Sequence, residues 1–174
     1  CMSLSKLGLP AARTGIVVAS PEVIRAISET TAVMSLAPGS IGPALALNLI
    51  QSRRIIELSQ TVVRPFYHQR MQAAVGLLRD KLDGIDYGMH KPEGAIFLWL
   101  WFKNLPVPSA RLYQRLKQRG VLVISGHYFF PGLEHDDWPH KHQCIRMTYS
   151  QKEPVVQKGI EIIADEIKAI YAGA

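Results

Sequence analysis

The sequence predicts a mixed α/β fold, and two patterns along the chain point to it. Short β-branched or aromatic runs, typical of strands, alternate with longer segments whose apolar residues recur every three or four positions, as in helices. The chain has 174 residues, 48% of them apolar and 20% charged, so it is able to bury a core and does not resemble a disordered protein. We expect one junction, near residues 59–65, between a first and a second part.

The first part begins with a predicted strand and continues as helix. Residues 14–19, TGIVVA, are a β-branched run typical of a buried strand. Ser20 is a candidate N-cap, and Pro21 suits the first position of the helix that follows. Prolines and glycines in residues 36–43, LAPGSIGP, interrupt this pattern, and helical spacing resumes over residues 44–58.

The second part alternates helix and strand. A long helical stretch covers residues 62–82, and Pro65 either starts this helix or kinks it. Residues 96–102 form an aromatic strand, and the next helix has Ser109 as its N-cap and Gly120 as its end. The remaining predicted elements are short strands at 121–125 and 144–150 and an amphipathic closing helix at 153–171.

Composition excludes several classes of protein. The net charge is +6, but the basic residues are spread along helical segments between carboxylates and apolar residues, so we expect no nucleic-acid partner. No apolar run approaches the ~18 residues of a membrane span, and we expect none. Cys1 and Cys144 do not form a disulfide framework, and the first residues lack the layout of a signal peptide, which favours a cytoplasmic protein.

The surroundings of Lys6 favour a site for an aldehyde that carries a phosphate. A lone lysine is ordinarily a solvated surface charge. Here, however, the hydroxyls of Ser3 and Ser5 are suited to phosphate oxygens, and the guanidinium of Arg13 is suited to an anion. A glycine and a proline between them bend the chain so that Lys6 and Arg13 approach one point. A nucleophilic amine beside a phosphate cradle indicates pyridoxal phosphate as the cofactor.

These residues resemble the motif of the fold-type-I pyridoxal-phosphate aminotransferases of classes I and II. That motif is Ser-x-Ser-Lys, a glycine-rich turn and Arg-x-Gly, and the chain has Ser3-Leu4-Ser5-Lys6 and Arg13-Thr14-Gly15. The resemblance implies that Lys6 is the catalytic residue, because it holds the cofactor covalently and moves the substrate proton. It also implies that Ser3, Ser5 and Arg13 bind the cofactor.

The resemblance extends along the whole chain. The segments KPEGAIFLWLWF, GVLVISGHYFFPG and CIRMTYS are similar to segments of the small domain of that family. Arg146 in the last of them is implied to bind the α-carboxylate of the substrate through two parallel hydrogen bonds; the alternative is a surface arginine on a strand. Residues 1–60 would be the end of the large cofactor-binding domain with the start of the interdomain helices, and residues 61–174 the small α/β domain. We therefore expect the chain to be a C-terminal part that lacks an N-terminal half.

The activity implied by the resemblance is amino transfer. The intact protein would exchange an amino group between an aliphatic amino acid of the valine or alanine type and a 2-oxo acid such as pyruvate. It would act as a homodimer, and we expect the present chain alone to be inactive. The alternative is a module without catalytic activity that binds an amino acid through Arg146 for regulation.

A histidine-rich segment between the last two predicted strands is the main competing feature. Its metal-binding residue types are His127, His135, Asp136, Asp137, His140, His142 and Cys144. Their spacing does not match structural zinc sites, and His140 and His142 would point to opposite sides of a strand. We therefore expect no metal and interpret the segment as a polar active-site loop. Its aromatic residues would line the substrate pocket or belong to the core.

Overall fold

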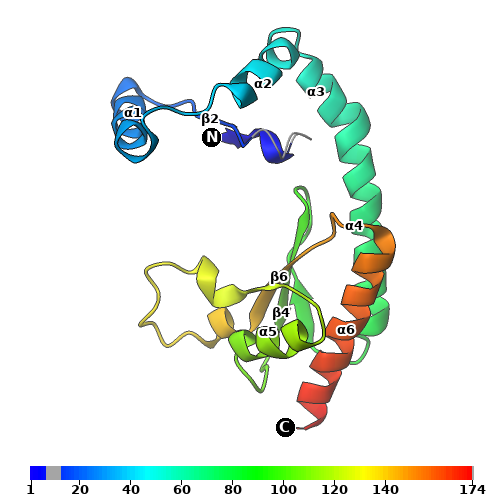
Figure 1. The fold of residues 1–174 in the computed structure, drawn as a ribbon. Coiled ribbons are helices and arrows are strands. Elements are labelled where there is room, and N and C mark those ends of the chain that lie inside the picture. The colour runs from blue at the N-terminus through cyan, green and yellow to red at the C-terminus, as the bar shows by residue number, and fades with distance from the viewer. Residues whose placement is uncertain (7–12, 174) are drawn as a thin grey trace. The chain divides into compact units, whose positions relative to one another are not determined.

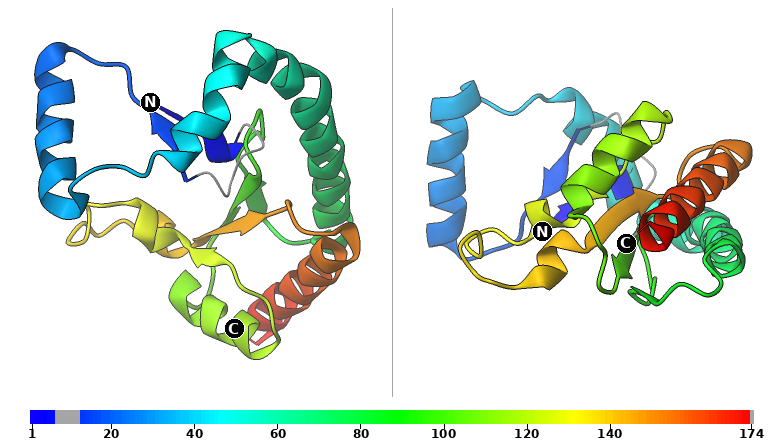
Figure 2. Two further views of the ribbon diagram at one scale, coloured as in Figure 1. Left: turned by 45° about the horizontal axis from the view of Figure 1, so that its top comes forward. Right: turned by 90° about the horizontal axis from the view of Figure 1, so that it is seen from below.

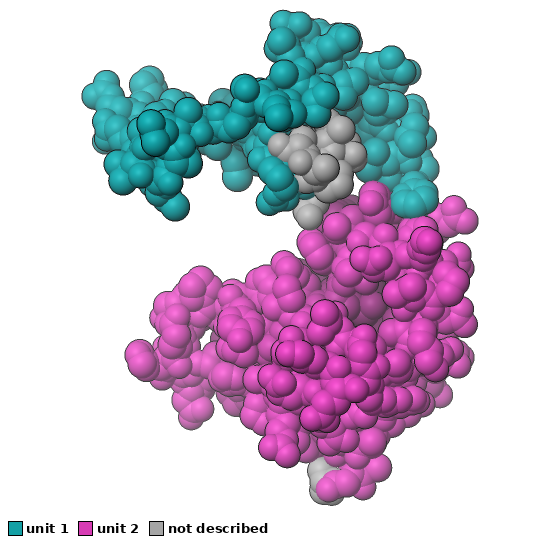
Figure 3. Space-filling view, viewed as in Figure 1, with its two compact units in different colours: residues 1–66 teal, residues 67–174 magenta. Residues whose placement is uncertain are grey.

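The computed structural model describes residues 1–6 and 13–173, and it confirms the mixed α/β fold. The chain divides into two compact units, unit 1 with Cys1–Phe66 and unit 2 with Tyr67–Ala174 (Figure 3). The units meet within helix α4 (Arg64–Lys81), a few residues after the predicted boundary between residues 60 and 61. That they correspond to the end of a large domain and to a small domain stays a prediction.

Unit 1 begins with two very short strands. Strand β1 (Met2–Ser3) pairs antiparallel with β2 (Gly15–Ile16), and the 3₁₀ helix η1 (Leu4–Lys6) follows β1 directly. The predicted buried strand over residues 14–19 is therefore wrong in its length, and Val18 is 88% exposed. A β-branched run stays a strand only where a neighbour pairs with it, and β1 is the sole partner of β2 among the described residues.

Three helices continue unit 1. They are α1 (Pro21–Ser35), α2 (Ile41–Gln51) and α3 (Arg54–Leu58). The start of α1 at Pro21 is confirmed, with Ser20 in the extended conformation of an N-cap, although its hydroxyl makes no capping hydrogen bond. Helix α2 begins earlier than predicted, because Pro43 lies in its first turn, where a missing N–H leaves no helical hydrogen bond unmade.

A π-helical turn joins α3 to α4. This turn (Ser59–Val63) ends where the N–H of Arg64 donates to the carbonyl of Ser59, five residues earlier. The next residue, Pro65, has no N–H and stands second in α4. Pro65 was predicted either to start the helix or to kink it. In the structure it stands one residue after the start of α4, and the widened π-helical turn before it lets the helix continue through the proline.

An antiparallel sheet forms the centre of unit 2 (Figure 1). In spatial order its strands are β3 (Tyr87–Met89), β4 (Phe97–Phe102), β6 (Cys144–Thr148) and β5 (Ile124–Ser125). The predicted strands over 96–102 and 144–150 are present within about a residue or two at their ends. The predicted strand over 121–125 is reduced to its last two residues, and β3 was not predicted.

Helices cover one face of this sheet (Figures 1 and 2). They are α4, α5 (Ser109–Gln118) and α6 (Glu153–Ala172), and α6 lies beside α4 in both figures. Alternate residues of β4 point to them, since Leu98, Leu100 and Phe102 are buried in one core with the apolar faces of these helices. The other residues of β4 therefore lie on the opposite face.

The ends of the helices in unit 2 agree with the sequence except at one position. Gly120 stops α5 as predicted, with φ at +79°, and α6 spans the predicted closing helix. Ser109 is not an N-cap but the first residue of α5, after Pro108. Its hydroxyl is instead used inside the core, in a 2.7 Å hydrogen bond with the hydroxyl of Ser125. Among the described residues no helix is both long and apolar enough to cross a membrane.

Candidate functional site

The serine and arginine side chains predicted to bind the cofactor come together in unit 1. The N–H of Ser5 donates to the hydroxyl oxygen of Ser3 at 3.3 Å, and Nη1 of Arg13 donates to the hydroxyl oxygen of Ser5 at 3.4 Å. Two hydroxyls and one guanidinium therefore gather within two short segments of the chain.

The backbone fixes these two segments to each other. Ser3 is paired with Gly15 in the β1–β2 ladder, and the N–H of Leu4 donates to the carbonyl of Thr14 at 3.0 Å. The Leu4 side chain is fully buried in the small core of unit 1, against Ala46 of α2. Because Leu4 points inward, its serine neighbours on either side lie at the surface of this core.

Arg13 has the features of an anion-binding residue. Its φ of 45° lies in the left-handed region, which residues other than glycine adopt rarely and often at functional positions. Its side chain is exposed, and no carboxylate within residues 1–6 and 13–173 forms an ion pair with it. Hydroxyls beside such a guanidinium fit the phosphate group of pyridoxal phosphate.

Lys6 ends the 3₁₀ helix η1 that carries Ser5. Its backbone is thus in the same short segment as the serine hydroxyls. Its side chain lies outside the described part of the structure, as do Gly8 and Pro10, so its predicted role stays a prediction.

Arg146 is on β6 in unit 2, with Trp99 of β4 on one side and Ile124 of β5 on the other. Its guanidinium carbon is 4.3 Å from the ring centre of Phe97 and 4.5 Å from that of Phe129. These contacts bring the cation close to two aromatic rings. No described carboxylate pairs with Arg146, which leaves the guanidinium N–H groups for an external carboxylate.

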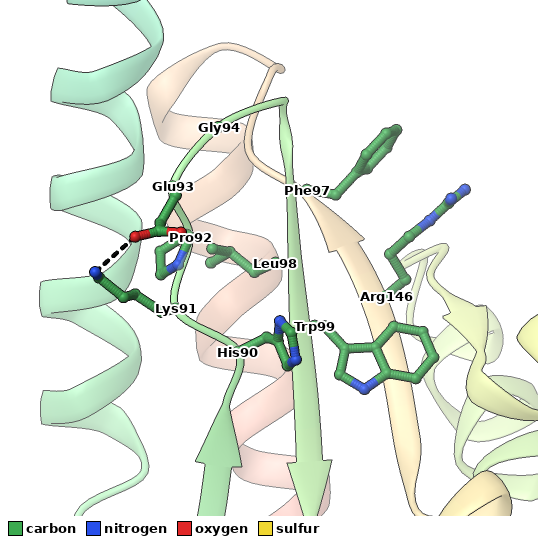
Figure 4. Close-up of a pocket in the computed structure, with 9 residues that line it drawn as sticks. All are labelled: His90, Lys91, Pro92, Glu93, Gly94, Phe97, Leu98, Trp99 and Arg146. Atoms are coloured by element: carbon green, nitrogen blue, oxygen red, sulfur yellow. Dashed lines mark ion pairs between the residues drawn. The ribbon is translucent and has the colours of Figure 1, made fainter. Parts of the chain in front are cut away.

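Beside Arg146 is an open cavity of about 300 Å³ (Figure 4). Figure 4 shows the side chains of Arg146 and Phe97 pointing to the same side, while Lys91 and Glu93 of the preceding turn lie on the other side of β4. That turn is closed by an ion pair of 2.6 Å between Lys91 and Glu93. Its end is tied to β6, since the hydroxyl of Thr148 donates to the carbonyl of Ile96 at 3.0 Å. The cavity thus has one cationic wall on a fixed strand.

A second cavity, of about 510 Å³, adjoins the first and shares His90 and Trp99 with it. Its lining is mainly aromatic and consists of Gly88, Met89, His90, Trp99, Trp101, Phe129, Phe130 and His140. Trp99 meets Phe129 edge to face at 5.2 Å, and Trp101 meets His140 at 4.8 Å. Phe129 and Phe130 of the histidine-rich loop thus line a cavity. That this cavity is the substrate pocket stays a prediction.

The prediction that His140 and His142 lie on a strand is wrong. His140 and His142 lie on the 3₁₀ helix η5 (Pro139–His142), and His142 stacks on His127 of the 3₁₀ helix η4 (Gly126–Phe129) with ring centres 5.9 Å apart. Burial, and secondarily the charge of His142, lower the pKa of His127. Within the described residues no three His, Cys, Asp or Glu side chains are arranged to hold a metal ion.

Cys144 is the buried thiol at the end of this loop. Burial raises its pKa to about 11, so the thiol stays protonated at neutral pH. Its sulfur is 3.5 Å from Nε2 of His140, and its S–H donates to the carbonyl oxygen of that residue. Cys144 therefore behaves as a core side chain rather than as a nucleophile.

Sequence reasoning overlooked part of the surroundings of Arg146. Phe97, Trp99 and Trp101 alternate along the predicted strand, which already indicates that they share a face. The contact of Phe129 with Arg146 had no such signal, because it depends on how the loop folds back. The remaining predicted residue set, Ser3, Ser5, Lys6 and Arg13, belongs to unit 1, whereas Arg146 belongs to unit 2.

Comparisons with known proteins agree on one kind of enzyme. The profile of the family described as "Aminotransferase class I and II" matches residues 1–163. A valine–pyruvate aminotransferase from Escherichia coli (strain K12) is 51% identical over 172 residues, which are 99% of this chain and 41% of that protein.

Two solved structures are similar to the chain as well. A protein from Psychrobacter arcticum 273-4, assigned as an amino-acid aminotransferase, has a TM-score of 0.91 and 45% identity over 99% of this chain and 39% of its own. The valine–pyruvate aminotransferase from Salmonella typhimurium LT2 has a TM-score of 0.89 and 49% identity, over 99% of this chain and 44% of its own. The present chain thus spans less than half of each of these relatives.

Proposed function

Since the chain belongs to the family of class I and II aminotransferases, we propose that the intact protein is a pyridoxal-phosphate-dependent aminotransferase. It exchanges an amino group between an aliphatic amino acid of the valine or alanine type and a 2-oxo acid such as pyruvate. The observation that carries this proposal is the arginine at the carboxylate site, Arg146, held between two aromatic rings without a described carboxylate partner. The substrate pair is suggested by the name of the relative from Escherichia coli at 51% identity.

Ser3, Ser5 and Arg13 bind the phosphate group of the cofactor in this proposal. Their hydrogen bonds already orient the hydroxyls and the guanidinium toward one another, so little side-chain freedom is lost when the anion binds. When bound, pyridoxal phosphate supplies an electron sink that makes the Cα proton of an amino acid acidic. Lys6 would hold the cofactor covalently through Nζ until the amine of the substrate displaces this nitrogen, and the freed Nζ would then accept and return the proton of the substrate Cα.

Arg146 orients the substrate. Two parallel N–H···O hydrogen bonds fix the plane of the α-carboxylate, and thereby the direction in which the Cα–H bond points. The aromatic rings at 4.3 and 4.5 Å limit the movement of the guanidinium, which favours one orientation of a bound carboxylate. The apolar character of the adjoining cavity favours an amino acid with an apolar side chain.

We also propose a homodimer in the cytoplasm. Helix α1 has no buried residue, and Val33 and Met34 within it and Leu36 at its end are largely exposed. Apolar surface of this extent suits contact with another protein surface, such as a second subunit. Cys1 and Cys144 are both free, as expected in a reducing compartment.

The proposal is tested with the intact protein, titrated with pyridoxal phosphate while the visible absorbance is recorded. We expect a cofactor band that borohydride fixes to the protein, and transfer from valine to pyruvate that produces alanine. The Lys6→Ala variant should lose the fixed band. A protein that binds amino acids through Arg146 but shows neither band nor transfer would instead be the regulatory module considered above.

A further inference from the structure

Lys141 is a buried lysine whose ammonium group donates hydrogen bonds to three backbone carbonyls. It lies on η5 and is 5% exposed. Its Nζ donates hydrogen bonds to the carbonyl oxygens of Leu133 at 2.6 Å, Glu134 at 3.1 Å and Asp136 at 2.7 Å. An ammonium group has three N–H donors, and here each has an acceptor in the preceding loop.

These hydrogen bonds join the end of the loop between β5 and β6, at η5, to its middle, at residues 133–136. Backbone carbonyls that converge on one point repel one another through their dipoles, and a cation at that point removes the repulsion. The other hydrogen bonds described within the loop are local and join residues two to four positions apart, such as that from the N–H of Gly132 to the carboxylate of Glu134 at 3.0 Å. The ammonium of Lys141 is therefore the main tie between η5 and residues 133–136.

Ring contacts of the loop lead from His140, next to Lys141, toward the carboxylate site, and Phe129 and Phe130 at their end both meet Trp99. The neighbouring His140 stacks on Trp138 with ring centres 4.9 Å apart, and Trp138 meets Phe130 at 5.2 Å. Phe130 follows Phe129, whose ring covers the guanidinium of Arg146. The loop thus delivers one of the two rings that hold Arg146.

We propose that Lys141 is a positioning residue for the carboxylate site. By holding residues 133–136 against η5, it fixes the aromatic contacts of the loop and, through them, the Phe129 ring over Arg146. This inference rests on the proposed function only for its kinetic test, because the order of the loop can be measured without any activity.

The first experiment measures amide hydrogen exchange in the intact protein and in three variants. Lys141→Met keeps the approximate length of the side chain and removes its donors. Lys141→Arg keeps the charge, but a planar guanidinium cannot direct three donors from a single nitrogen to the three carbonyls. Lys158→Met, on the exposed side of α6, is the matched control. We expect exchange in residues 129–138 to rise about tenfold in Lys141→Met, to rise less in Lys141→Arg, and to stay unchanged in the control.

The second experiment measures steady-state amino transfer and, separately, the binding of pyruvate by calorimetry. We expect the KM for the amino acid and the Kd for pyruvate to rise about tenfold in Lys141→Met, with kcat within about threefold of the wild type. The KM and Kd of Lys141→Arg should lie between those of the wild type and of Lys141→Met. If Lys141→Met does not fold, the values of Lys141→Arg decide. A wild-type protein without transfer activity would refute the proposed function. The role of Lys141 would then still be tested by amide hydrogen exchange and by the Kd for pyruvate, neither of which needs activity.

Two results would overturn the role of Lys141. One is a loop whose exchange is unchanged in Lys141→Met, since the ammonium would then not order it. The other is a loop that loosens while KM and the Kd for pyruvate stay at the wild-type values, since the order of the loop would then not reach Arg146.

Discussion

Trp99 on β4 stands directly opposite Arg146 on β6. Such cross-strand partners point to the same face of a sheet and lie within contact of each other. This face is opposite to the one covered by α4, α5 and α6, where Leu98 and Leu100 are buried. Because Trp99 also lines both cavities, it forms the wall between the arginine and the aromatic pocket.

Replacement of Arg146 by lysine should weaken substrate binding and leave the cofactor in place. Lysine keeps the charge but loses the pair of parallel hydrogen bonds, which costs on the order of 2–3 kcal/mol in kcat/KM. Kinetics with valine and pyruvate, together with a titration of the cofactor, measure both effects. Arg111→Lys on the exposed side of α5 serves as the control. A loss of cofactor affinity with normal substrate binding would assign Arg146 to another site.

The Lys6→Ala variant of the intact protein should lose amino transfer and keep its fold. In the proposed function Lys6 both holds the cofactor and carries the Cα proton, so turnover should fall by at least a factor of about 100. Single-turnover assays measure the loss, and circular dichroism checks the fold. Lys168→Ala, on the closing helix, should retain the activity of the wild type. Turnover above about one per cent of that rate would remove Lys6 from the mechanism.

Gly126 and Gly159 should respond in opposite ways to replacement by alanine. A Cβ on Gly126 would lie 2.7 Å from the Cβ of Cys144 and 2.8 Å from its carbonyl oxygen, so Gly126→Ala should destabilise unit 2 by about 1–3 kcal/mol. A Cβ on Gly159, within α6, meets no atom within 4 Å, and Gly159→Ala should stabilise by about 0.5–1 kcal/mol. Urea unfolding measures both. Equal effects of the two replacements would contradict the close packing at Gly126.

Glu166 links α6 to α5 through two arginines. Its carboxylate accepts hydrogen bonds from Arg115 at 2.7 Å and Arg119 at 3.0 Å, and its side chain is 13% exposed. Burial, the largest single influence, raises the pKa of Glu166, but the hydrogen bonds and charges of the two arginines together outweigh it and lower the pKa. Glu166→Gln should therefore destabilise the protein at neutral pH, by about 1 kcal/mol because both arginines are partly in solvent.

The sign of the pH dependence follows from this lowered pKa. The stabilisation is complete above the unfolded-state pKa of the carboxyl and is lost as the pH falls through the lower folded-state value. Thermal unfolding of wild type and Glu166→Gln should thus differ at neutral pH and converge in acid. Asp165→Asn, which removes a single exposed contact of 3.2 Å, is the control and should have little effect at either pH. A difference that grows in acid would contradict the assignment.

The elements that were predictable are those whose pattern is local. The start of α1 at Pro21, the stop of α5 at Gly120 and the strand Phe97–Phe102 each follow from a residue type or a spacing within a few positions. Strand β3 was missed because its three residues include a glycine and acquire their conformation by pairing with β4. The strand at residues 14–19 was predicted too long for the same reason, since pairing and not propensity sets its length.

The candidate site was predictable to a similar degree. The serine and arginine residues near Lys6 form one motif, and Arg146 lies in another, so both could be found by resemblance. The carbonyl contacts of Lys141 depend on backbone atoms that any sequence supplies, and nothing in PHKHQ indicates them. The contact of Phe129 with Arg146 likewise requires the folded loop.

The pairing of β4 with β6 has a consequence for biosynthesis. Helix α5 and the whole loop between β5 and β6 separate the two strands along the chain, so the central contact of the sheet is formed late. While the ribosome adds these residues, the apolar strand Phe97–Phe102 has emerged with only β3 beside it. Until Thr148 is available to pair with Phe97, this strand is an open edge that other nascent chains are able to join, and a chaperone that binds FLWLWF would protect it during that interval.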